Sequence, residues 1–414
     1  MRVAYFSPMP PNSSGIADYS ALLVPELARL VELEVISEPK RRMGKGCDLA
    51  LYHVGNNPEV HGWIVEALRE RPGLVVLHEH VLHHLVAGMT IAVGDTDGYL
   101  DAMQRDAGVV GRLLAHGIID GVVPPVWESR PMDFPLCGEI LDLATGLIVH
   151  SQTVEDAARS RGYAGPIYRI PHPAWPKPAI VTDAALSGVS GPIFGAFGHL
   201  NTAKRVPQLV EAFARVVEQQ PDAKLLLVGT ASEEIHIDDR LAEIERTHPG
   251  AVIRLPYVDE TRLWNLLAAC DVCVCLRYPT MGETSGIAIR ALVCGRPLIV
   301  SDVGWFSELS DAVACKIPVN DQEVETLANA MMSLATDAAR RNAMSTAASQ
   351  YVEEVCAVER IADAYRLAIV DVAGGDVVRR LVVNELSEAA AAIGIDMDEP
   401  AGIDLRNAIR ESGL

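Results

Sequence analysis

Residues 281–302 hold the side chains and turns best suited to chemistry. A polar turn with Gly282, Glu283 and Gly286 opens the stretch, and an apolar segment follows it up to Gly295. A helix that begins at such a turn presents free backbone N–H groups and the positive end of its dipole, which together bind anions. Glu283 stands beside this anion site, where its carboxylate suits a sugar hydroxyl better than a phosphate. The stretch therefore predicts a ligand that is part phosphate and part sugar.

A second glycine-containing turn lies between a predicted strand at 192–197 and a predicted helix at 205–219. It runs from Gly195 to Gly198, and Lys204 follows just before the helix. This order places backbone N–H groups where a phosphate can reach them, and Lys204 adds a cation. The alternative is an ordinary loop with a solvated Lys-Arg pair. The turn lacks the third glycine of the dinucleotide fingerprint, and the chain has no P-loop motif.

Histidines and a glutamate gather where the predicted strand at 73–79 ends; they are His78, Glu79, His80, His83 and His84. The carboxyl edge of a parallel sheet is where cleft residues are expected. We therefore interpret His78 as a side chain that lines a ligand cleft. A structural histidine and a metal ligand are the alternatives, although the run is not the H-E-x-x-H zinc motif.

Three of the eight cysteines form a C-x-x-C-x-C pattern, at Cys270, Cys273 and Cys275. The pattern runs from a helix end into an apolar strand, where alternation places the last two on one buried face. No second Cys/His cluster completes a four-ligand site. We interpret these cysteines as small core residues rather than metal ligands or a disulfide. The D-x-D triplets at 95–97 and 396–398 end no apolar strand, and we interpret both as surface turns.

Short apolar runs alternate with longer amphipathic segments, which is the pattern of a parallel α/β sheet. The first half predicts strands at 2–7, 33–37, 48–54, 73–79, 146–151 and 167–171, with helices at 17–31, 58–70 and 152–160. The second half predicts strands at 192–197, 223–229, 252–257, 272–277, 297–301 and 312–317, with helices at 205–219, 239–248, 260–269 and 286–294. Two such units predict a ligand cleft between facing strand ends.

The length of 414 residues is too great for one ordinary core, so two domains are expected. We place an N-terminal domain at 1–173, with a helical insertion at 81–143, and a Pro-rich linker at 174–191. We place a C-terminal domain at 192–365. A helical extension at 366–414 follows, with helices predicted at 377–393 and 403–412.

The net charge of −20 and the pI of about 5.0 argue against nucleic acid as a partner. The one basic run, Lys40 to Lys45, is interpreted as a solvated loop, with an acceptor-phosphate or lipid-surface patch as the alternative. The sequence shows no run of about 18 apolar residues and no signal-peptide pattern. We expect a cytoplasmic protein with peripheral membrane contact at most.

Several motifs together resemble the GT-B glycosyltransferases of family 4, also called group 1 glycosyltransferases. The main ones are Gly198-His199-Leu-x3-Lys204, Glu283-Thr284-Ser285-Gly286 and Ala291-Leu-Val-Cys-Gly295-Arg-Pro. Supporting matches are Gly15-Ile-Ala-Asp18, Val149-His-Ser151, Ile170-Pro-His172-Pro, Tyr257-Val258 and Ala269-Cys-Asp271-Val. The resemblance covers about residues 1–370.

The resemblance implies roles for these positions. For the donor's phosphates it implies Gly15, Gly198, His199, Lys204, Arg205, Ser285, Gly286 and Ile287. In the family an Arg often stands at the position of His199, so we expect Arg205 to supply the second cation. For the transferred sugar it implies Glu283 and Thr284, with His78 on the cleft wall. For the base it implies Tyr257 and Val258, which can equally be a plain strand end.

Three further residues are candidates for the site, and two of them have a structural alternative. Asp18 is expected on the acceptor side and can equally be a helix-start residue. Glu79 is expected on the acceptor side as well. Arg290 is interpreted as a ligand contact near the sugar or ribose, or as a structural helix residue.

The family usually has two glutamates separated by seven residues, and this chain departs from that pattern. An alignment on Glu283 puts Ala291 at the second position, whereas an alignment on Gly295 puts Arg290 there. The segment is one residue shorter than usual, so its second carboxylate is absent. Recognition of the ribose, and with it the choice of base, stays open.

The resemblance implies a GT-B fold, two Rossmann-like domains facing across a cleft. The N-terminal domain is then on the acceptor side, the C-terminal domain binds the nucleotide-sugar donor, and the C-terminal helical extension is expected to cross back to the first domain. The resemblance also implies a retaining, metal-independent transfer of a sugar from a nucleotide-diphosphate-sugar to a hydroxyl of a sugar, glycolipid or small-molecule acceptor, with no cofactor. His78, Lys204 and Glu283 are the expected catalytic residues. A nucleotide-sugar epimerase or hydrolase and a non-catalytic sugar-nucleotide binding protein are the alternatives, and the sequence leaves open a homo-oligomer.

Overall fold

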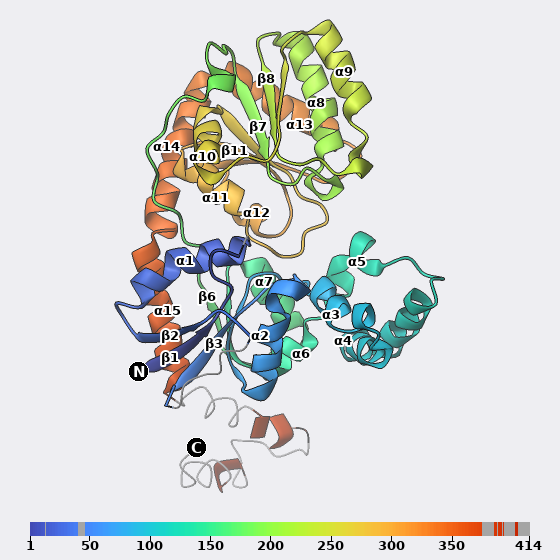
Figure 1. Cartoon of the computed structure of the whole chain (residues 1–414), viewed down its shortest axis with the longest axis vertical. Coiled ribbons are helices and arrows are strands. Elements are labelled where there is room, and N and C mark those ends of the chain that lie inside the picture. The colour runs from blue at the N-terminus through green and yellow to red at the C-terminus, as the bar shows by residue number, and fades with distance from the viewer. Residues whose placement is uncertain are drawn as a thin grey trace.

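Two parallel six-stranded sheets, one in each half of the chain, form the frame of the computed structural model (Figure 1). The structure describes residues 1–12, 14–39, 46–374, 385, 386, 388–390, 392 and 402–404. All twelve strands predicted from the sequence are present, with ends that differ by at most two residues.

The N-terminal sheet has the strand order β2-β1-β3-β4-β5-β6. Its strands are β1 (Arg2–Phe6), β2 (Glu32–Ile36), β3 (Leu49–Val54), β4 (Gly73–Leu77), β5 (Ala144–Val149) and β6 (Ile167–Arg169). The helices that cover it include α1 (Gly15–Leu27), α2 (Pro58–Glu70) and α7 (Gln152–Ser160). Every residue of β3 and β4 is buried, which explains their continuous apolar sequence.

The C-terminal sheet has the strand order β12-β11-β10-β7-β8-β9. Its strands are β7 (Ile193–Phe197), β8 (Lys224–Val228), β9 (Val252–Leu255), β10 (Val272–Cys275), β11 (Leu298–Ser301) and β12 (Ala314–Ile317). Its helices are α8 (Val206–Gln219), α9 (Asp238–Thr247), α10 (Glu260–Ala269), α11 (Gly286–Val293), α12 (Trp305–Glu308), α13 (Glu323–Thr336) and α14 (Ala338–Val355). Short 3-10 turns lie at η3 (Ala184–Leu186), η4 (Thr202–Lys204) and η5 (Glu233–Ile235).

Side-chain caps set where the helices near the cleft begin. Ser14 accepts a hydrogen bond from Ala17 N, Ser151 from Val154 N and Ser285 from Ala288 N. The first helix ends at Leu27, four residues before the predicted end, because a turn at 28–30 leads directly into β2. Cys270 and Cys273 are buried in the C-terminal core, and all eight cysteines are unpaired.

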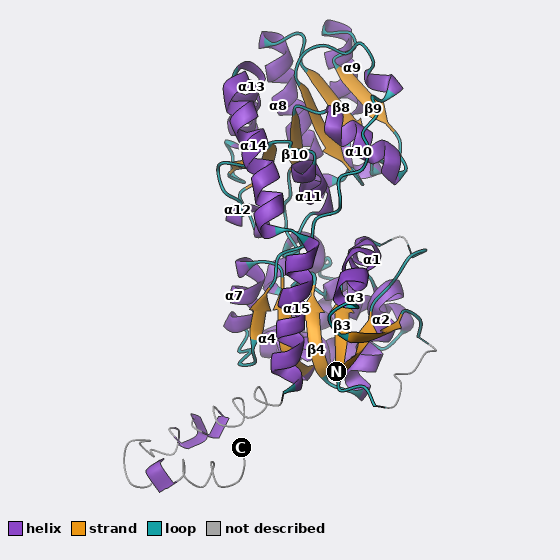
Figure 2. Ribbon diagram, turned by 90° about the vertical axis from the view of Figure 1, so that its left-hand side faces the viewer, coloured by secondary structure: helices purple, strands orange, loops and turns teal. Residues whose placement is uncertain are grey.

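The chain returns to the N-terminal domain at α15 (Val358–Ala373), which follows α14 along one side of the molecule (Figure 2). Ile361, Tyr365 and Ile369 of α15 are buried in the N-terminal core, and Tyr365 Oη lies 2.6 Å from Tyr19 Oη. The predicted domain end at residue 365 falls inside this helix, since its apolar face begins to pack on the first sheet at Ile361. Of the helices predicted at 377–393 and 403–412, the structure describes residues 385, 386, 388–390, 392, 403 and 404, which are helical. The rest of these predictions lies outside the described residues.

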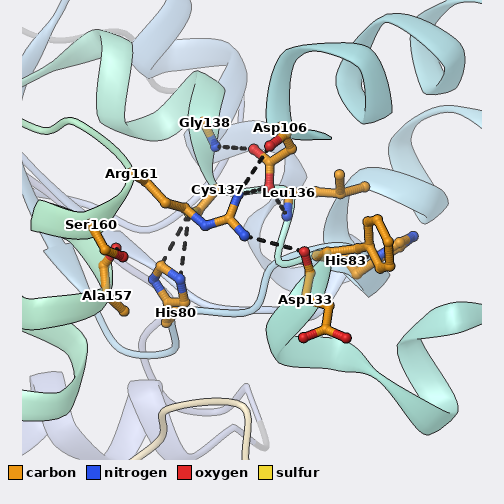
Figure 3. Close-up of polar contacts among 11 residues, drawn as sticks. His80, His83, Asp106, Asp133, Leu136, Cys137, Gly138, Ala157, Ser160 and Arg161 are labelled. Atoms are coloured by element: carbon orange, nitrogen blue, oxygen red, sulfur yellow. Dashed lines mark hydrogen bonds and ion pairs between the residues drawn. The ribbon is translucent and has the colours of Figure 1, made fainter. Parts of the chain in front are cut away.

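The predicted helical insertion at 81–143 is present and projects to one side of the first domain (Figure 1). It contains α3 (His83–Met89), η1 (Ile91–Val93), α4 (Thr96–Ile119), α5 (Val126–Ser129), η2 (Pro131–Asp133) and α6 (Gly138–Leu143). Asp106 ties it down: its carboxylate accepts hydrogen bonds from Leu136 N and Gly138 N and pairs with Arg161 at 2.9 Å (Figure 3). Cys137 Sγ lies 3.9 Å from His80 Nδ1, so the insertion also contacts the segment that follows β4.

No helix within the described part of the chain is long and apolar enough to span a membrane.

We predict that Ile369→Ala lowers the free energy of unfolding by about 2–5 kcal/mol, because it opens a cavity where α15 packs on the first sheet. Leu367→Ala is the matched control, since Leu367 on the same helix is 55% exposed. Urea denaturation followed by circular dichroism measures both. Equal stability of the two variants would show that α15 does not belong to the N-terminal core.

Candidate functional site

The two domains meet where a loop of the C-terminal domain, residues 278–285, contacts the end of β4. Met281 O accepts hydrogen bonds from His80 N at 2.9 Å and from Val81 N at 3.0 Å. Gly282 allows the approach: its φ is +85°, and a Cβ there would lie 3.0 Å from His80 Cβ. The loop therefore docks through backbone groups and tolerates little at Gly282 except glycine.

A carboxylate of the C-terminal domain caps a helix of the other domain. Glu308, at the end of α12, accepts hydrogen bonds from Gln152 N, Thr153 N and Thr153 Oγ1 at 2.8–2.9 Å. These groups form the first turn of α7, whose positive dipole end favours a carboxylate. Glu308 thus holds the two domains together on the side of β5 and α7.

The first candidate site is a cavity of about 200 Å³ inside the C-terminal domain, here called the C-domain pocket. Its wall includes Lys204, Arg277 and the segment 283–287, which begins α11. Lys204 Nζ donates a hydrogen bond to Phe197 O at 2.6 Å. Burial, with a contribution from the nearby Arg277, lowers the Lys204 pKa to about 8. Two cations and a helix N-terminus here form an anion site.

Arg277 is a pocket residue that sequence reasoning missed. It comes two residues after β10, at the carboxyl edge of the sheet, and its Nε lies 2.8 Å from Glu283 Oε1. The position at a strand end was the available signal. Glu283 Oε2 also accepts a hydrogen bond from Met281 N at 2.7 Å, so the loop at 278–285 holds this carboxylate in place.

Arg205, predicted as the second cation, points elsewhere. Its guanidinium forms an ion pair with the buried Glu323, and it does not line the C-domain pocket. Its left-handed backbone, φ +54°, separates η4 from α8. In the structure Arg277, rather than Arg205, joins Lys204.

The other predicted phosphate contacts of the C-terminal domain differ in how they lie relative to this pocket. Ser285, Gly286 and Ile287 line the C-domain pocket. Gly198 adjoins it, because a Cβ there would lie 2.5 Å from Lys204 Nζ. His199 is exposed and lies outside the wall.

The second candidate site is a cavity of about 240 Å³ between the domains, here called the interdomain pocket. It shares Glu283, Thr284 and Gly286 with the C-domain pocket, so the two cavities adjoin. Its other walls come from both domains and the linker: Ser14, Gly15, Ile16, Tyr19, Asn56, Asn57, His61, His78, Glu79, His150, His172, Trp175 and Arg290. The structure thus brings Gly15, His78, Glu79, Glu283, Thr284 and Arg290 together.

His78 is buried, and both its ring nitrogens are engaged. Nδ1 lies 3.2 Å from His150 Nε2, and Nε2 lies 2.9 Å from His53 Nδ1. Burial, followed by the neighbouring histidines, lowers the His78 pKa well below its usual range. His78 therefore faces the pocket as a neutral ring whose hydrogen bonds are already made inside the protein.

Glu79 and Glu283 face the same pocket from opposite domains. Glu79 Oε1 accepts one hydrogen bond, from Asn56 N at 3.3 Å. Burial, followed by the charge of Glu283, raises the Glu79 pKa to about 7. At neutral pH this carboxyl is divided between its protonated and ionised forms.

Arg290 lines the interdomain pocket, whereas Ala291 is fully buried in the C-terminal core. The Arg290 guanidinium stacks 3.6 Å from the ring centroid of Trp175. It also lies 3.2 Å from Glu260 and 3.5 Å from Asp18 of the other domain. Arg290 is thus the pocket-facing residue of the divergent segment.

Trp175, which sequence reasoning placed in a plain linker, is another missed pocket residue.

The two predicted base contacts lie outside both pockets. Tyr257 is 80% exposed, Val258 packs on the C-terminal core, and neither lines the two pockets. Within the described ranges, no group of three or more His, Cys, Asp or Glu side chains is arranged to hold a metal ion.

Comparison with solved structures shows that the fold is GT-B. The chain superposes on sucrose-phosphate synthase from Thermosynechococcus elongatus with a TM-score of 0.58 and 20% identity, covering 93% of this chain and 100% of that one. It superposes on Anabaena HepE, solved with UDP and glucose, with a TM-score of 0.59 and 16% identity, covering 90% and 100%. The predicted fold class is confirmed, down to two facing Rossmann-like domains.

Sequence comparison gives partial matches, all shorter than half of the chain. Residues 191–337 match the family model described as Glycosyl transferases group 1. Over 170 residues the chain is 29% identical to a GDP-mannose-dependent monoacylated alpha-(1-6)-phosphatidylinositol monomannoside mannosyltransferase from Corynebacterium glutamicum, covering 39% of this chain and 42% of the relative. It is 28% identical over 172 residues to a D-inositol 3-phosphate glycosyltransferase from Kribbella flavida, covering 38% of each. The matches thus span about two fifths of these curated relatives.

We predict that Glu308→Ala loosens the domain contact by about 1 kcal/mol, because three hydrogen bonds to α7 are lost. The radius of gyration from small-angle X-ray scattering should rise. Asp311→Ala is the control, since exposed Asp311 pairs with Lys316 inside one domain. An unchanged scattering profile for Glu308→Ala would contradict the capping role.

Glu79→Gln should change how stability depends on pH. The Glu79 pKa is raised from 4.5 to about 7, so the folded state holds this proton more tightly than the unfolded chain does. The protonated Glu79 therefore adds to the free energy of unfolding. This added stability is complete below pH 4.5 and is lost as the pH rises through 7. We expect wild type to lose roughly 1–3 kcal/mol more than the variant between about pH 5 and pH 8. Urea denaturation measures this, with exposed Glu59→Gln as control; parallel pH curves for wild type and Glu79→Gln would refute it.

Proposed function

We propose that the protein is a group 1 glycosyltransferase that moves a sugar from a nucleotide-diphosphate-sugar to an acceptor hydroxyl. The observation that carries the proposal is the C-domain pocket, where Lys204, Arg277 and the start of α11 surround one cavity. The interdomain pocket adjoins it through Glu283 and Thr284, so the donor's sugar and the acceptor can meet there.

The chemistry that this arrangement supports is stabilisation of a departing diphosphate. As the bond from the anomeric carbon to phosphate breaks, negative charge grows on the phosphate oxygens. Lys204, Arg277 and the free N–H groups of α11 are in place before the reaction and supply the opposite charge. We propose that the transfer needs no metal and retains the anomeric configuration, and that it takes place in the cytoplasm.

The names of similar proteins support a nucleotide-sugar donor. One relative is named for its dependence on GDP-mannose, and HepE was solved with UDP and glucose. These names describe those two proteins. A nucleotide-sugar donor, which carries phosphates, would fit the wall of the C-domain pocket, where Lys204 and Arg277 lie. A base contact at Tyr257 and Val258 remains part of the proposal.

An epimerase or hydrolase on the same fold is the second candidate. Glu79 favours it, because a carboxyl with a pKa of about 7 beside Glu283 can exchange protons with water in the pocket. Free sugar or epimer released from labelled donor without any acceptor would support this candidate over transfer.

We predict that Lys204→Ala weakens binding of nucleoside diphosphates and lowers the rate by about 10²–10³-fold. A thermal-shift screen of UDP, GDP and ADP measures binding, since ligand at about 100 Kd adds about 2.7 kcal/mol to stability. For wild type, affinity should fall as the pH rises through about 8, because Lys204 loses its proton there.

In the Lys204→Ala variant, affinity for the nucleoside diphosphate should not fall as the pH rises through about 8. Lys177→Ala is the control, since Lys177 is exposed on the linker and lines neither pocket. A Lys204→Ala protein with wild-type affinity and rate would overturn the proposed function.

A further inference from the structure

The histidines around the interdomain pocket have defined tautomers, because their hydrogen bonds end on backbone carbonyls. A carbonyl oxygen can only accept, so the ring nitrogen that faces it must carry the hydrogen. His150 Nδ1 faces Ile170 O at 2.8 Å and is therefore the donor. In the neutral ring, His150 Nε2 then carries no hydrogen and presents a lone pair.

The tautomer of His150 determines the tautomers of the two histidines linked to it, His78 and His53. His150 Nε2 accepts, so His78 Nδ1 donates to it at 3.2 Å. His78 Nε2 is then a lone pair and accepts from His53 Nδ1 at 2.9 Å. His78 and His150 therefore have no ring nitrogen left for a ligand.

Two other histidines do have one. His61 Nδ1 donates to His53 O at 3.1 Å, and His172 Nδ1 donates to Pro173 O at 2.7 Å. Both residues line the interdomain pocket. Among the described residues neither Nε2 has a hydrogen-bond partner, so each presents a lone pair.

These lone pairs persist at neutral pH. Burial lowers the pKa of His61 to about 4 and, with help from His150, that of His172 to about 3. Each ring thus stays neutral and accepts a hydrogen bond but cannot donate one from Nε2. A hydroxyl group satisfies such an atom, whereas an ionised phosphate oxygen repels it.

The charges of the pocket agree with this. Its carboxyl groups are Glu79 and Glu283, and Arg290 is the basic side chain among the described residues of its wall. The Arg290 charge is matched by Glu260 and Asp18. Its buried Nε has no acceptor and can donate to an oxygen.

The hydroxyl of Thr284 adds to the pattern. Thr284 Oγ1 is buried without a partner, and Thr284 lines both pockets. A hydroxyl that can donate and accept suits a ligand with hydroxyl groups of its own. The wall thus offers acceptors on the histidine side and donors on the Arg290 side.

We propose that the interdomain pocket selects an uncharged polyol, such as an unphosphorylated sugar ring, with His61 and His172 accepting its hydroxyl hydrogens. This inference rests on the proposed function, in which phosphates bind in the C-domain pocket and the acceptor binds between the domains. The pocket discriminates against a ring that carries a phosphate, although a relative is named for inositol 3-phosphate.

The test uses the full chain, first saturated with whichever of UDP, GDP or ADP stabilises it. Glucose, mannose and myo-inositol are then titrated beside glucose 6-phosphate, mannose 6-phosphate and inositol 3-phosphate, and binding is followed by saturation-transfer NMR. We expect at least one uncharged polyol to bind at least tenfold more tightly than its phosphorylated counterpart.

Variants locate the effect. His172→Phe and His61→Phe each remove one lone pair at similar ring size, and each should weaken polyol binding about three- to tenfold. Nucleotide binding should not change, which shows that each variant is folded. His116→Phe, at an exposed site on α4, is the matched control and should bind like wild type.

Three outcomes overturn the inference: a phosphorylated ring that binds as well as its parent, variants that leave polyol binding unchanged, or no polyol binding to the nucleotide complex. The proposed function fails separately, if no nucleoside diphosphate binds. Polyol binding without nucleotide binding would then keep the pocket assignment and reject the glycosyl transfer.

Discussion

The loop at 278–285 sets the geometry on which both pockets depend. It reaches from the C-terminal domain to the end of β4, where Met281 O accepts two backbone hydrogen bonds from His80 and Val81. The same loop supplies the N–H that holds Glu283. Glu283 consequently faces Glu79 of the other domain, and the C-domain pocket opens toward the interdomain pocket at one place. Glu308 of α12, which caps α7, and Arg290, which lies beside Asp18, stabilise the contact on two further sides.

The two pockets differ in their charged groups and therefore favour different parts of a ligand. The C-domain pocket gathers Lys204, Arg277 and a helix N-terminus, which favour phosphate. The interdomain pocket gathers carboxyl groups and neutral imidazoles, which favour hydroxyl groups. Burial is the common cause: it brings the Lys204 pKa down, raises that of Glu79, and keeps the histidines neutral. A ligand with a diphosphate at one end and a sugar at the other matches both parts.

The sequence predicted the fold well, because its strands and helices follow local rules. Buried parallel strands appear in the sequence as apolar runs, and the helices predicted to begin at 152 and 286 begin there, each after a capping serine, Ser151 and Ser285. Side-chain direction was harder to predict. Lys204 and Arg205 are adjacent in sequence, yet Arg205 itself has a left-handed backbone, and Glu323, over a hundred positions away, binds its guanidinium.

Among the pocket residues that the sequence did not predict, Arg277 and Trp175 show the same difficulty. Arg277 and Trp175 carry no motif, and only the folded chain brings them to Glu283 and Arg290. His78 shows the opposite case: sequence placed it at the cleft, but its ring nitrogens bind His53 and His150 instead of facing outward. Which nitrogen of a histidine is available depends on neighbours from other strands, and spacing along the chain does not record them.

A crystal structure of the full chain with a bound nucleoside diphosphate and an uncharged polyol tests the central claim most directly. The account predicts phosphate oxygens at about 3 Å from Lys204 Nζ and from the N–H groups that begin α11. It predicts polyol hydroxyls at similar distances from His172 Nε2 and His61 Nε2. A phosphate group bound between the domains, or a nucleotide bound away from Lys204 and Arg277, would contradict it.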